Sequence, residues 1–341
     1  MQLTGIRQME MFDAPKPDIQ NDTDVLVRMQ AVGVCGSDVH YYVNGKIGSQ
    51  VVQFPFAVGH EGAGIVEKLG AAVSSLRVGD RIAIEPAMPC GTCDQCICGR
   101  PHTCRKLKFL GCPGQAEGCL SEYIVMPQGS CLPIPSGMSF EQAVISEPLA
   151  IGLYAARLAG ELKGKNIAIL GSGPIGLSVL SGAILADANK KIVTDKIDER
   201  LLLAQKSGAT ATYNILREDV VEDVKKQEPL LLDAVFECCG QQDALDQAIQ
   251  LLKPGGKLII VGIPDFSMFA FPVDDLRRKE ITIRNVRRQN GCDKEAVRLI
   301  ADGSVAVDHW ITHHFSFDRT KAAFDLVAGY KDGVMKAMIR M

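Results

Sequence analysis

A glycine-rich hexapeptide between an apolar segment and an amphipathic one limits the folds open to this chain. Residues 166–170 read NIAIL, residues 171–176 read GSGPIG, and the pattern that follows predicts a helix over 174–186. Further apolar segments, beginning at 191–195, alternate with helical patterns. This alternation is typical of an α/β fold with a doubly wound parallel sheet, in which a helix crosses back over the sheet after each strand.

The hexapeptide has the form G-x-G-x-x-G, and its surroundings favour a dinucleotide site over a purely structural turn. A strand is predicted before it, a helix after it, and Asp195 ends the next predicted strand. Gly171 permits a tight turn, Gly173 lets a pyrophosphate approach the backbone, and Gly176 lets the helix pack on the sheet. A carboxylate at 195 favours NAD over NADP, although Lys196 weakens that preference. The predicted dinucleotide contacts are Gly171, Gly173, Pro174, Ile175, Gly176, Asp195 and Arg200.

The residues before this alternation have a different texture. Short segments rich in Gly, Pro and Val, such as DVLVRMQAVGV and GAGIVEKLG, predict a barrel-like or irregular β-rich domain. We expect this domain over 1–150, the parallel sheet over 151–285, and a segment over 286–341 that returns to the first domain. A helix is predicted over 147–164, ending at Gly164.

Five of the twelve cysteines lie in one short stretch, CGTCDQCICGRPHTC at 90–104. Closely spaced thiolates with glycines between them suit a closed tetrahedral zinc site, which is structural because it has no open coordination position. A disulfide knot would need an oxidising compartment. Cys98 and His102 are spare, and either could replace a member. The predicted ligands are Cys90, Cys93, Cys96 and Cys104.

A second set of metal-binding residue types is spread along the chain. Cys35 lies in GVCGSD, His60 and Glu61 in GHEGAG, and Glu147 in SEPLA. Singly, each has an ordinary structural explanation, and spacing alone does not bring them together. Together, a thiolate, an imidazole and a carboxylate with a water in the fourth position describe an open, catalytic zinc.

Taken in order, these motifs resemble the zinc-dependent medium-chain dehydrogenases and, within them, the polyol branch with sorbitol and xylitol dehydrogenases. The segment GHEGAGIVEKLGAAV at 59–73 matches the family's G-H-E-x-x-G-x5-G-x-x-V pattern, and CGSD, the four-cysteine lobe, EP and GSGPIG lie in the family's order. The resemblance covers essentially the whole chain. It implies a GroES-like β-rich catalytic domain that carries both zincs, a Rossmann NAD-binding domain, and an active site in the cleft between them.

The resemblance also implies the ligands of the catalytic zinc. Cys35, His60 and one of Glu61 and Glu147 are expected to bind the ion, with the other glutamate behind it or bound through water. Asp38 matches the residue that orients the zinc-bound imidazole. The family does not decide between the two glutamates.

The implied reaction is oxidation of a secondary hydroxyl of a polyol to a ketone, with hydride transfer to NAD. Ser37 is expected to accept a hydrogen bond from the alcohol, and His40 to pass the proton outward; the alternative for His40 is a surface imidazole. Tyr41 and Asn290 are expected to contact substrate and Arg287 the cofactor. The residues expected to act in catalysis are Ser37, His40 and Glu147.

Other substrates and another class of protein stay open at this point. Threonine, an aldose or a vicinal diol are alternative substrates within the same family. The alternative from another class is a zinc-stabilised nucleotide-binding protein without catalysis, which would be expected to lack one of the zinc ligands.

Charge and composition bear on partners. The formal net charge is −3, and no long Lys/Arg run suits a nucleic acid or an anionic membrane. The first residues, MQLTGIRQMEMF, lack the basic and apolar regions of a signal peptide, so we expect none. We therefore expect a cytoplasmic enzyme that acts on a small molecule, without a nucleic-acid or membrane partner. The resemblance implies a homotetramer or a homodimer.

Overall fold

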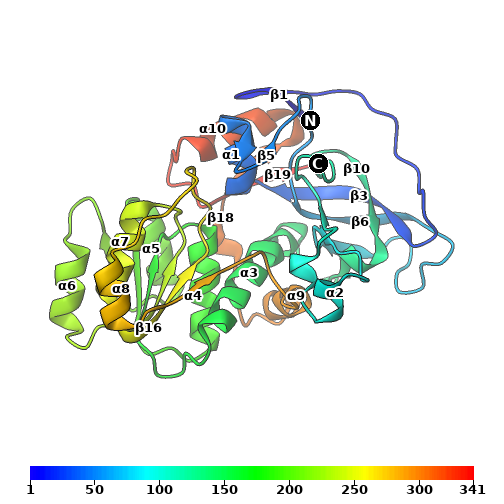
Figure 1. The fold of residues 1–341 in the computed structure, drawn as a ribbon. Coiled ribbons are helices and arrows are strands. Elements are labelled where there is room, and N and C mark those ends of the chain that lie inside the picture. The colour runs from blue at the N-terminus through cyan, green and yellow to red at the C-terminus, as the bar shows by residue number, and fades with distance from the viewer. The chain divides into compact units, whose positions relative to one another are not determined.

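The computed structural model describes all residues, 1–341. The chain forms two compact units, and the second is inserted into the first (Figure 1). Unit 1 comprises Met1–Glu147 and Asp293–Met341, and unit 2 comprises Pro148–Cys292. None of the helices is both long enough and apolar enough to cross a bilayer.

Unit 1 is built on a seven-stranded, mostly antiparallel sheet. Its strands are β3 (Asp24–Gly33), β6 (Glu61–Leu69), β7 (Arg81–Ile84), β10 (Tyr123–Pro127), β11 (Cys131–Pro133), β18 (Ile311–Ser316) and β19 (Lys336–Arg340). Strand β3 is the centre, because it pairs with β6, β10 and β19. Residues from both ends of the unit's sequence therefore share one sheet.

Smaller elements complete unit 1. They are β1 (Gln2–Gly5), β2 (Gln8–Glu10), β4 (Lys46–Ile47), β5 (Gln50–Val51), β8 (Ala87–Met88), β9 (Lys108–Phe109), α1 (Gly36–Asn44), α2 (Asp94–Ile97), α9 (Asp293–Ala301) and α10 (Thr320–Ala328). Short 3-10 turns lie at Pro101–Thr103, Gln128–Ser130, Asp308–Trp310 and Phe317–Arg319. Helices α1 and α10 pack together through the rings of Tyr42 and Phe324, whose centroids are 5.5 Å apart.

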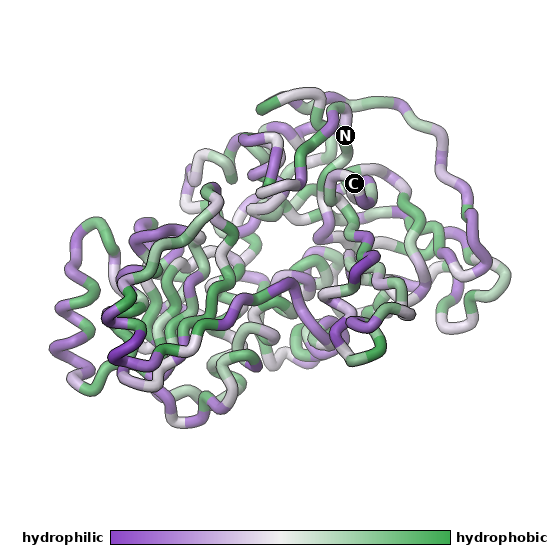
Figure 2. Tube along the Cα trace, in the orientation of Figure 1, coloured by the Kyte–Doolittle hydropathy of each residue, from purple (hydrophilic) through white to green (hydrophobic).

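Unit 2 is a six-stranded, fully parallel sheet in the order β14-β13-β12-β15-β16-β17. The strands are β12 (Ile167–Leu170), β13 (Lys191–Asp195), β14 (Ala211–Asn214), β15 (Leu232–Glu237), β16 (Leu252–Ile260) and β17 (Thr282–Asn285). The helices are α4 (Pro174–Leu185), α5 (Asp198–Lys206), α6 (Val220–Gln227), α7 (Gln242–Leu251) and α8 (Val273–Lys279). The order reverses between β12 and β15, as in a doubly wound nucleotide-binding sheet, so the predicted fold class is confirmed. Figure 2 shows the central strands as hydrophobic, as burial on both faces requires.

Helix α3 spans Phe140–Ala159, and the predicted bounds of 147–164 are wrong at both ends. It starts earlier because Ser139 and Gln142 form a capping box: the Ser139 hydroxyl accepts from the Gln142 N–H at 3.0 Å, and the Gln142 side chain accepts from the Ser139 N–H at 2.8 Å. It ends earlier because Gly160 takes a left-handed conformation with φ of 80°.

Candidate functional site

Three metal-binding side chains meet where β3 ends and β6 begins. Cys35 is the N-cap residue of α1, two residues after β3. Glu61 is the first residue of β6, and His60 directly precedes it. Antiparallel pairing places Gly33 opposite Glu61, which brings these ends of the two strands together. The ligand atoms of Cys35, His60 and Glu61 all lie within 4.8 Å of one another.

The donor set and its surroundings fit a zinc ion. His60 and Glu61 are buried, and a thiol, an imidazole and a carboxylate are the usual ligands of zinc. The Nδ1 atom of His60 lies 3.3 Å from Asp38 Oδ1, which leaves Nε2 for a metal. Burial lowers the pKa of His60, but the charges of Asp38 and Cys35 outweigh it and raise that pKa well above its usual value. The same negative field favours a bound cation.

Glu147 lies on α3 and is not within the three-residue cluster. Its Oε2 atom is inaccessible to solvent and has no hydrogen-bond partner, as expected for an oxygen that a metal ion or its bound water would engage. Burial raises the pKa of Glu147 to about 8; His60 opposes this change, and the carboxylates of Glu61 and Glu85 add to it. In the metal-free protein this carboxyl is therefore mostly protonated at pH 7.

The structure adds a residue that the sequence reasoning missed. Lys336, at the start of β19, is fully buried, and its Nζ lies 2.7 and 2.5 Å from the two oxygens of Glu61. A lysine more than 270 residues away in sequence gave no motif signal. The available hint was a lysine inside the apolar segment VMKAMI, because lysines that become buried are nearly always paired.

Helix α1 carries the other predicted residues of unit 1. Ser37 Oγ lies 3.3 Å from Cys35 Sγ. His40 is half-buried on the same helix. Tyr41 is buried, and its hydroxyl donates to Gln50 Oε1 at 3.0 Å. Burial raises the pKa of Tyr41, so its phenol stays neutral and can donate or accept a hydrogen bond.

The four-cysteine lobe, residues 90–104, forms a second metal-binding cluster. The sulfur atoms of Cys90, Cys93, Cys96 and Cys104 all lie within 4.8 Å of one another. Neighbouring sulfurs are 3.5 to 3.8 Å apart, and four thiolates tetrahedrally bound to zinc would be about 3.8 Å apart. The backbone N–H of Thr92 is the main cause that lowers the pKa of Cys90, to about 6. Cys98 is exposed and lies outside the cluster, and none of the cysteines is in a disulfide.

Unit 2 carries the predicted dinucleotide cradle at the carboxyl end of β12. Gly171 has φ of 100°, which favours glycine, and a Cβ on Gly176 would collide with the Gly171 carbonyl. Gly173 is the N-cap of α4, where Pro174 and Ile175 begin the helix. A Cβ on Gly173 would meet only the Arg200 guanidinium, at 3.6 Å, so the backbone there is open to a ligand.

Asp195 ends β13, next to the cradle. Its carboxylate accepts backbone N–H groups from Ser172, Lys196 and Ile197 at 2.7 to 3.0 Å, which fixes its orientation. Arg200 is buried on α5, and its guanidinium lies close to Gly173. The two remaining predicted residues, Arg287 and Asn290, follow β17; Arg287 is exposed and Asn290 half-buried.

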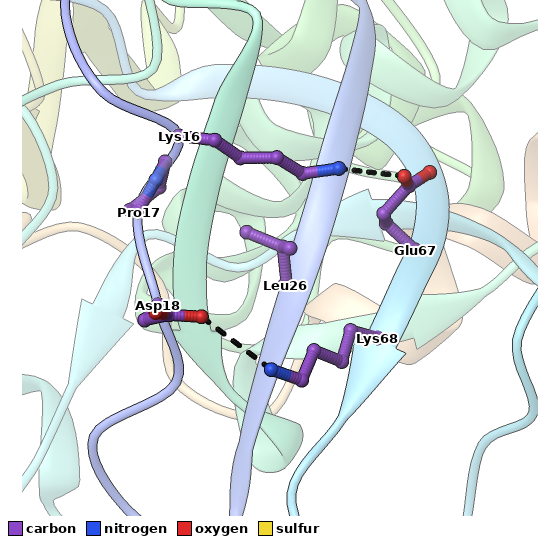
Figure 3. A pocket seen from close by; sticks show the side chains of 6 residues that line it. All are labelled: Lys16, Pro17, Asp18, Leu26, Glu67 and Lys68. Carbon is purple, nitrogen blue, oxygen red and sulfur yellow. Dashed lines mark hydrogen bonds and ion pairs between the residues drawn. The ribbon is translucent and has the colours of Figure 1, made fainter.

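A surface pocket lies apart from these clusters (Figure 3). Its charged side chains pair with one another, Lys16 with Glu67 at 2.7 Å and Lys68 with Asp18 at 3.4 Å. These pairs tie the segment after β2 to the sheet and offer no unpaired charge to a ligand.

Comparison with known proteins agrees with this geometry. Residues 21–136 match the alcohol dehydrogenase GroES-like domain, and residues 174–302 match the zinc-binding dehydrogenase domain. Sorbitol dehydrogenase of Bacillus subtilis strain 168 is 36% identical over 98% of this chain and 94% of its own. D-xylulose reductase A of Aspergillus niger is 34% identical over 96% of this chain and 93% of its own. A zinc-binding dehydrogenase structure from Sinorhizobium meliloti 1021, bound to NADP, superposes with a TM-score of 0.91 at 30% identity, covering 100% of this chain and 98% of its own.

The family models include both metal-binding clusters and begin again at Pro174, within the cradle, and the sorbitol dehydrogenase match covers nearly the whole chain. Zinc and a nicotinamide dinucleotide are the cofactors of the matched family. The chain therefore belongs to the zinc-dependent medium-chain dehydrogenases, in their polyol branch, and is an oxidoreductase of that class.

Proposed function

We propose that the protein oxidises a secondary hydroxyl of a sorbitol- or xylitol-like polyol to a ketone, with hydride transfer to NAD. The observation that carries the proposal is the convergence of Cys35, His60 and Glu61 in one buried cluster, with the unpartnered Glu147 oxygen in the same unit. The sorbitol dehydrogenase and D-xylulose reductase relatives support the substrate class.

In this proposal Cys35, His60 and Glu61 hold the catalytic zinc. When bound, zinc lowers the pKa of a coordinated hydroxyl, and NAD accepts the hydride. Asp38 keeps His60 in the tautomer that leaves Nε2 free for the metal. Glu147 would be the acid group behind this site: with zinc bound, its carboxylate would face the ion or a water bound to it.

The protein's own groups handle the substrate proton. Ser37 Oγ turns from Cys35 Sγ to accept the hydrogen bond of the substrate hydroxyl, and His40, one helical turn further on α1, passes the proton outward. Tyr41 presents a neutral hydroxyl to a hydroxyl-rich chain. The lobe cysteines Cys90, Cys93, Cys96 and Cys104 hold the structural zinc.

For the cofactor, the glycines of the cradle admit the pyrophosphate, and Asp195 accepts from the ribose hydroxyls. The three backbone N–H bonds to Asp195 support NAD, because they fix a negative charge where NADP would place its 2′-phosphate. Arg200 and Arg287 supply positive charge toward the cofactor, and Asn290 contacts the substrate.

A screen of substrates tests the proposal. Reduction of NAD and of NADP is followed with sorbitol, xylitol, ribitol, galactitol, threonine, glucose and butanediol, with and without a chelator. We expect a polyol with NAD to give the highest kcat/KM, and the chelator to abolish it. A preference for threonine, glucose or butanediol would contradict the polyol assignment, and full activity in metal-free enzyme would contradict the zinc assignment.

We also propose a cytoplasmic homodimer or homotetramer. Strand β17 ends its sheet with one unpaired edge, and nearby Met268 and Val273 are 82% and 75% exposed. Twelve unbridged cysteines support a reducing compartment. Light scattering of the purified protein gives the mass, and a monomer would contradict the oligomer.

A further inference from the structure

We propose that Lys336 is a positioning residue that holds the Glu61 carboxylate across strand β3 and so sets how tightly the candidate catalytic site binds its metal ion. The inference rests on the proposed function, because it takes Cys35, His60 and Glu61 as metal ligands. Lys336 touches neither the substrate nor the reacting atoms in this account, and acts through Glu61.

The two charged groups have almost no contact with water. The Lys336 side chain is 2% exposed and the Glu61 side chain 1%. The ammonium contacts both carboxylate oxygens and also the Val34 carbonyl, at 3.4 Å. A buried pair of this kind costs much desolvation free energy, so it is weak evidence for stability and better evidence for a specific task.

The backbone between the two residues is shaped for this contact. Glu61 belongs to β6 and Lys336 to β19, and these strands pair with opposite edges of β3. At the crossing point β3 has Gly33, which lies opposite Glu61 in the register. A Cβ on Gly33 would overlap Glu61 Oε2 and lie 2.9 Å from a methyl carbon of Val144. Because Gly33 has no side chain, the Glu61 carboxylate can occupy the space above it and contact the Lys336 ammonium.

The arrangement makes Lys336 a competitor of the metal ion. Both oxygens of Glu61 are engaged by the ammonium, so a metal ion has to share their lone pairs with it. The lysine also cancels one negative charge of a site that already holds a thiol and a second carboxyl group. A nearby positive charge in a buried site weakens the binding of any cation. Lys336 therefore keeps the metal affinity lower than the three ligands alone would give.

A double-mutant cycle, started from metal-free enzyme, tests whether Lys336 affects zinc affinity through Glu61. Zinc affinity is measured by chelator competition for wild type, Lys336→Met, Glu61→Gln and the double variant, and cobalt absorption spectra report the coordination. We expect Lys336→Met to tighten zinc binding by on the order of tenfold and to shift the cobalt bands. In the Glu61→Gln background the same change is expected to have much less effect, because the two residues act as a unit.

Three results would overturn the inference. They are unchanged or weaker zinc binding in Lys336→Met, an unaltered cobalt spectrum, and an equal effect of Lys336→Met with and without Glu61. Lys336→Arg keeps the positive charge and is the matched control; it is expected to keep near wild-type affinity. If Lys336→Met does not fold, Lys336→Gln replaces it. Its neutral amide can still donate a hydrogen bond to Glu61 but carries no positive charge, so it is expected to tighten zinc binding in the same direction.

A failure of the proposed function can be told apart from a failure of this inference. The zinc of the candidate catalytic site is identified as the equivalent that His60→Ala loses. If His60→Ala keeps the full zinc content, the ligand assignment is wrong whatever Lys336 does. If His60→Ala loses one equivalent while Lys336→Met binds zinc as wild type does, the ligands stand and only the role of Lys336 is wrong.

Discussion

The two metal-binding clusters of unit 1 contain different chemistry and are assembled in different ways. The lobe draws four thiols from residues 90–104, and three of these cysteines are partly exposed. The Cys35 cluster draws a thiol, an imidazole and a carboxylate from two segments, with Lys336 arriving from a third. The first cluster lies within one local chain segment, whereas the second needs the pairing of β3 with β6, and Lys336 joins it only when β19 pairs with β3.

The difference extends to how charge is balanced. In the lobe, backbone N–H groups lower the pKa of Cys90 and Cys93, whereas burial raises the pKa of Cys96 to about 12. In the buried cluster, charged side chains pair with one another instead, His60 with Asp38 and Glu61 with Lys336. In the proposed assignment, the structural site is held by one local segment, whereas the catalytic site is surrounded by buried counter-charges from other parts of the chain.

The largest effect is expected from removing one ligand of each cluster. His60→Ala should lower kcat/KM by at least about 10³-fold, because the Lewis acid that stabilises the alkoxide is worth several kcal/mol. Cys104→Ala should lose the other zinc equivalent and lower the Tm, while correctly folded molecules keep most of their activity. Zinc content, kcat/KM and thermal unfolding measure both. Comparable activity losses in the two variants would remove the distinction between the sites.

The second effect concerns the stability of the metal-free protein. Lys336→Met leaves Glu61 as an unpaired buried carboxylate, so the free energy of unfolding should fall by about 3–5 kcal/mol. Lys16→Met breaks the exposed pair with Glu67 in Figure 3 and should leave it nearly unchanged. Urea unfolding of both variants at one pH checks this. A similar loss in both would show that burial does not decide the value of these pairs.

The third effect is a pH dependence at the buried cluster. Burial raises the pKa of Glu147 from its ordinary 4.5 to about 8, so the folded protein binds this proton more tightly than the unfolded chain does. The contribution to stability is complete below about pH 4.5 and is lost as the pH rises through about 8. Relative to Glu147→Gln, metal-free wild type should lose about 1.4 kcal/mol of unfolding free energy per pH unit within that window. Parallel stability curves for the two proteins would contradict the assignment.

The smallest effect is expected in the lobe. Cys98 is exposed and lies outside the four-sulfur cluster, so Cys98→Ser should leave zinc content, Tm and activity unchanged. Its matched partner is Cys96→Ser, which should lose the lobe zinc. If Cys98→Ser also loses zinc, the ligand set of the lobe is wrong.

The contrast between local and long-range contacts also explains which parts of the fold and of the candidate site could be predicted from the sequence. The parallel sheet and the four lobe cysteines follow from local patterns, because each depends on residues close together in the chain. The start of α3 was missed although Ser139 and Gln142 form a capping box that could be recognised in the sequence. The contact of Glu61 with Lys336 was out of reach, because it depends on strand pairing across an inserted unit and on the missing side chain at Gly33.

Strand β19 has a consequence for biosynthesis. It pairs with the central strand β3, but the ribosome makes it only after all of unit 2, residues 148–292, has been translated. At ordinary translation speeds of about 5–20 residues per second, β3 and Glu61 wait on the order of ten seconds or longer for their partners. All six strands of unit 2 are therefore synthesised before β18 and β19 of unit 1. During that interval the Glu61 carboxylate has no ammonium beside it, and a chaperone or an early metal ion would meet the nascent chain in that state.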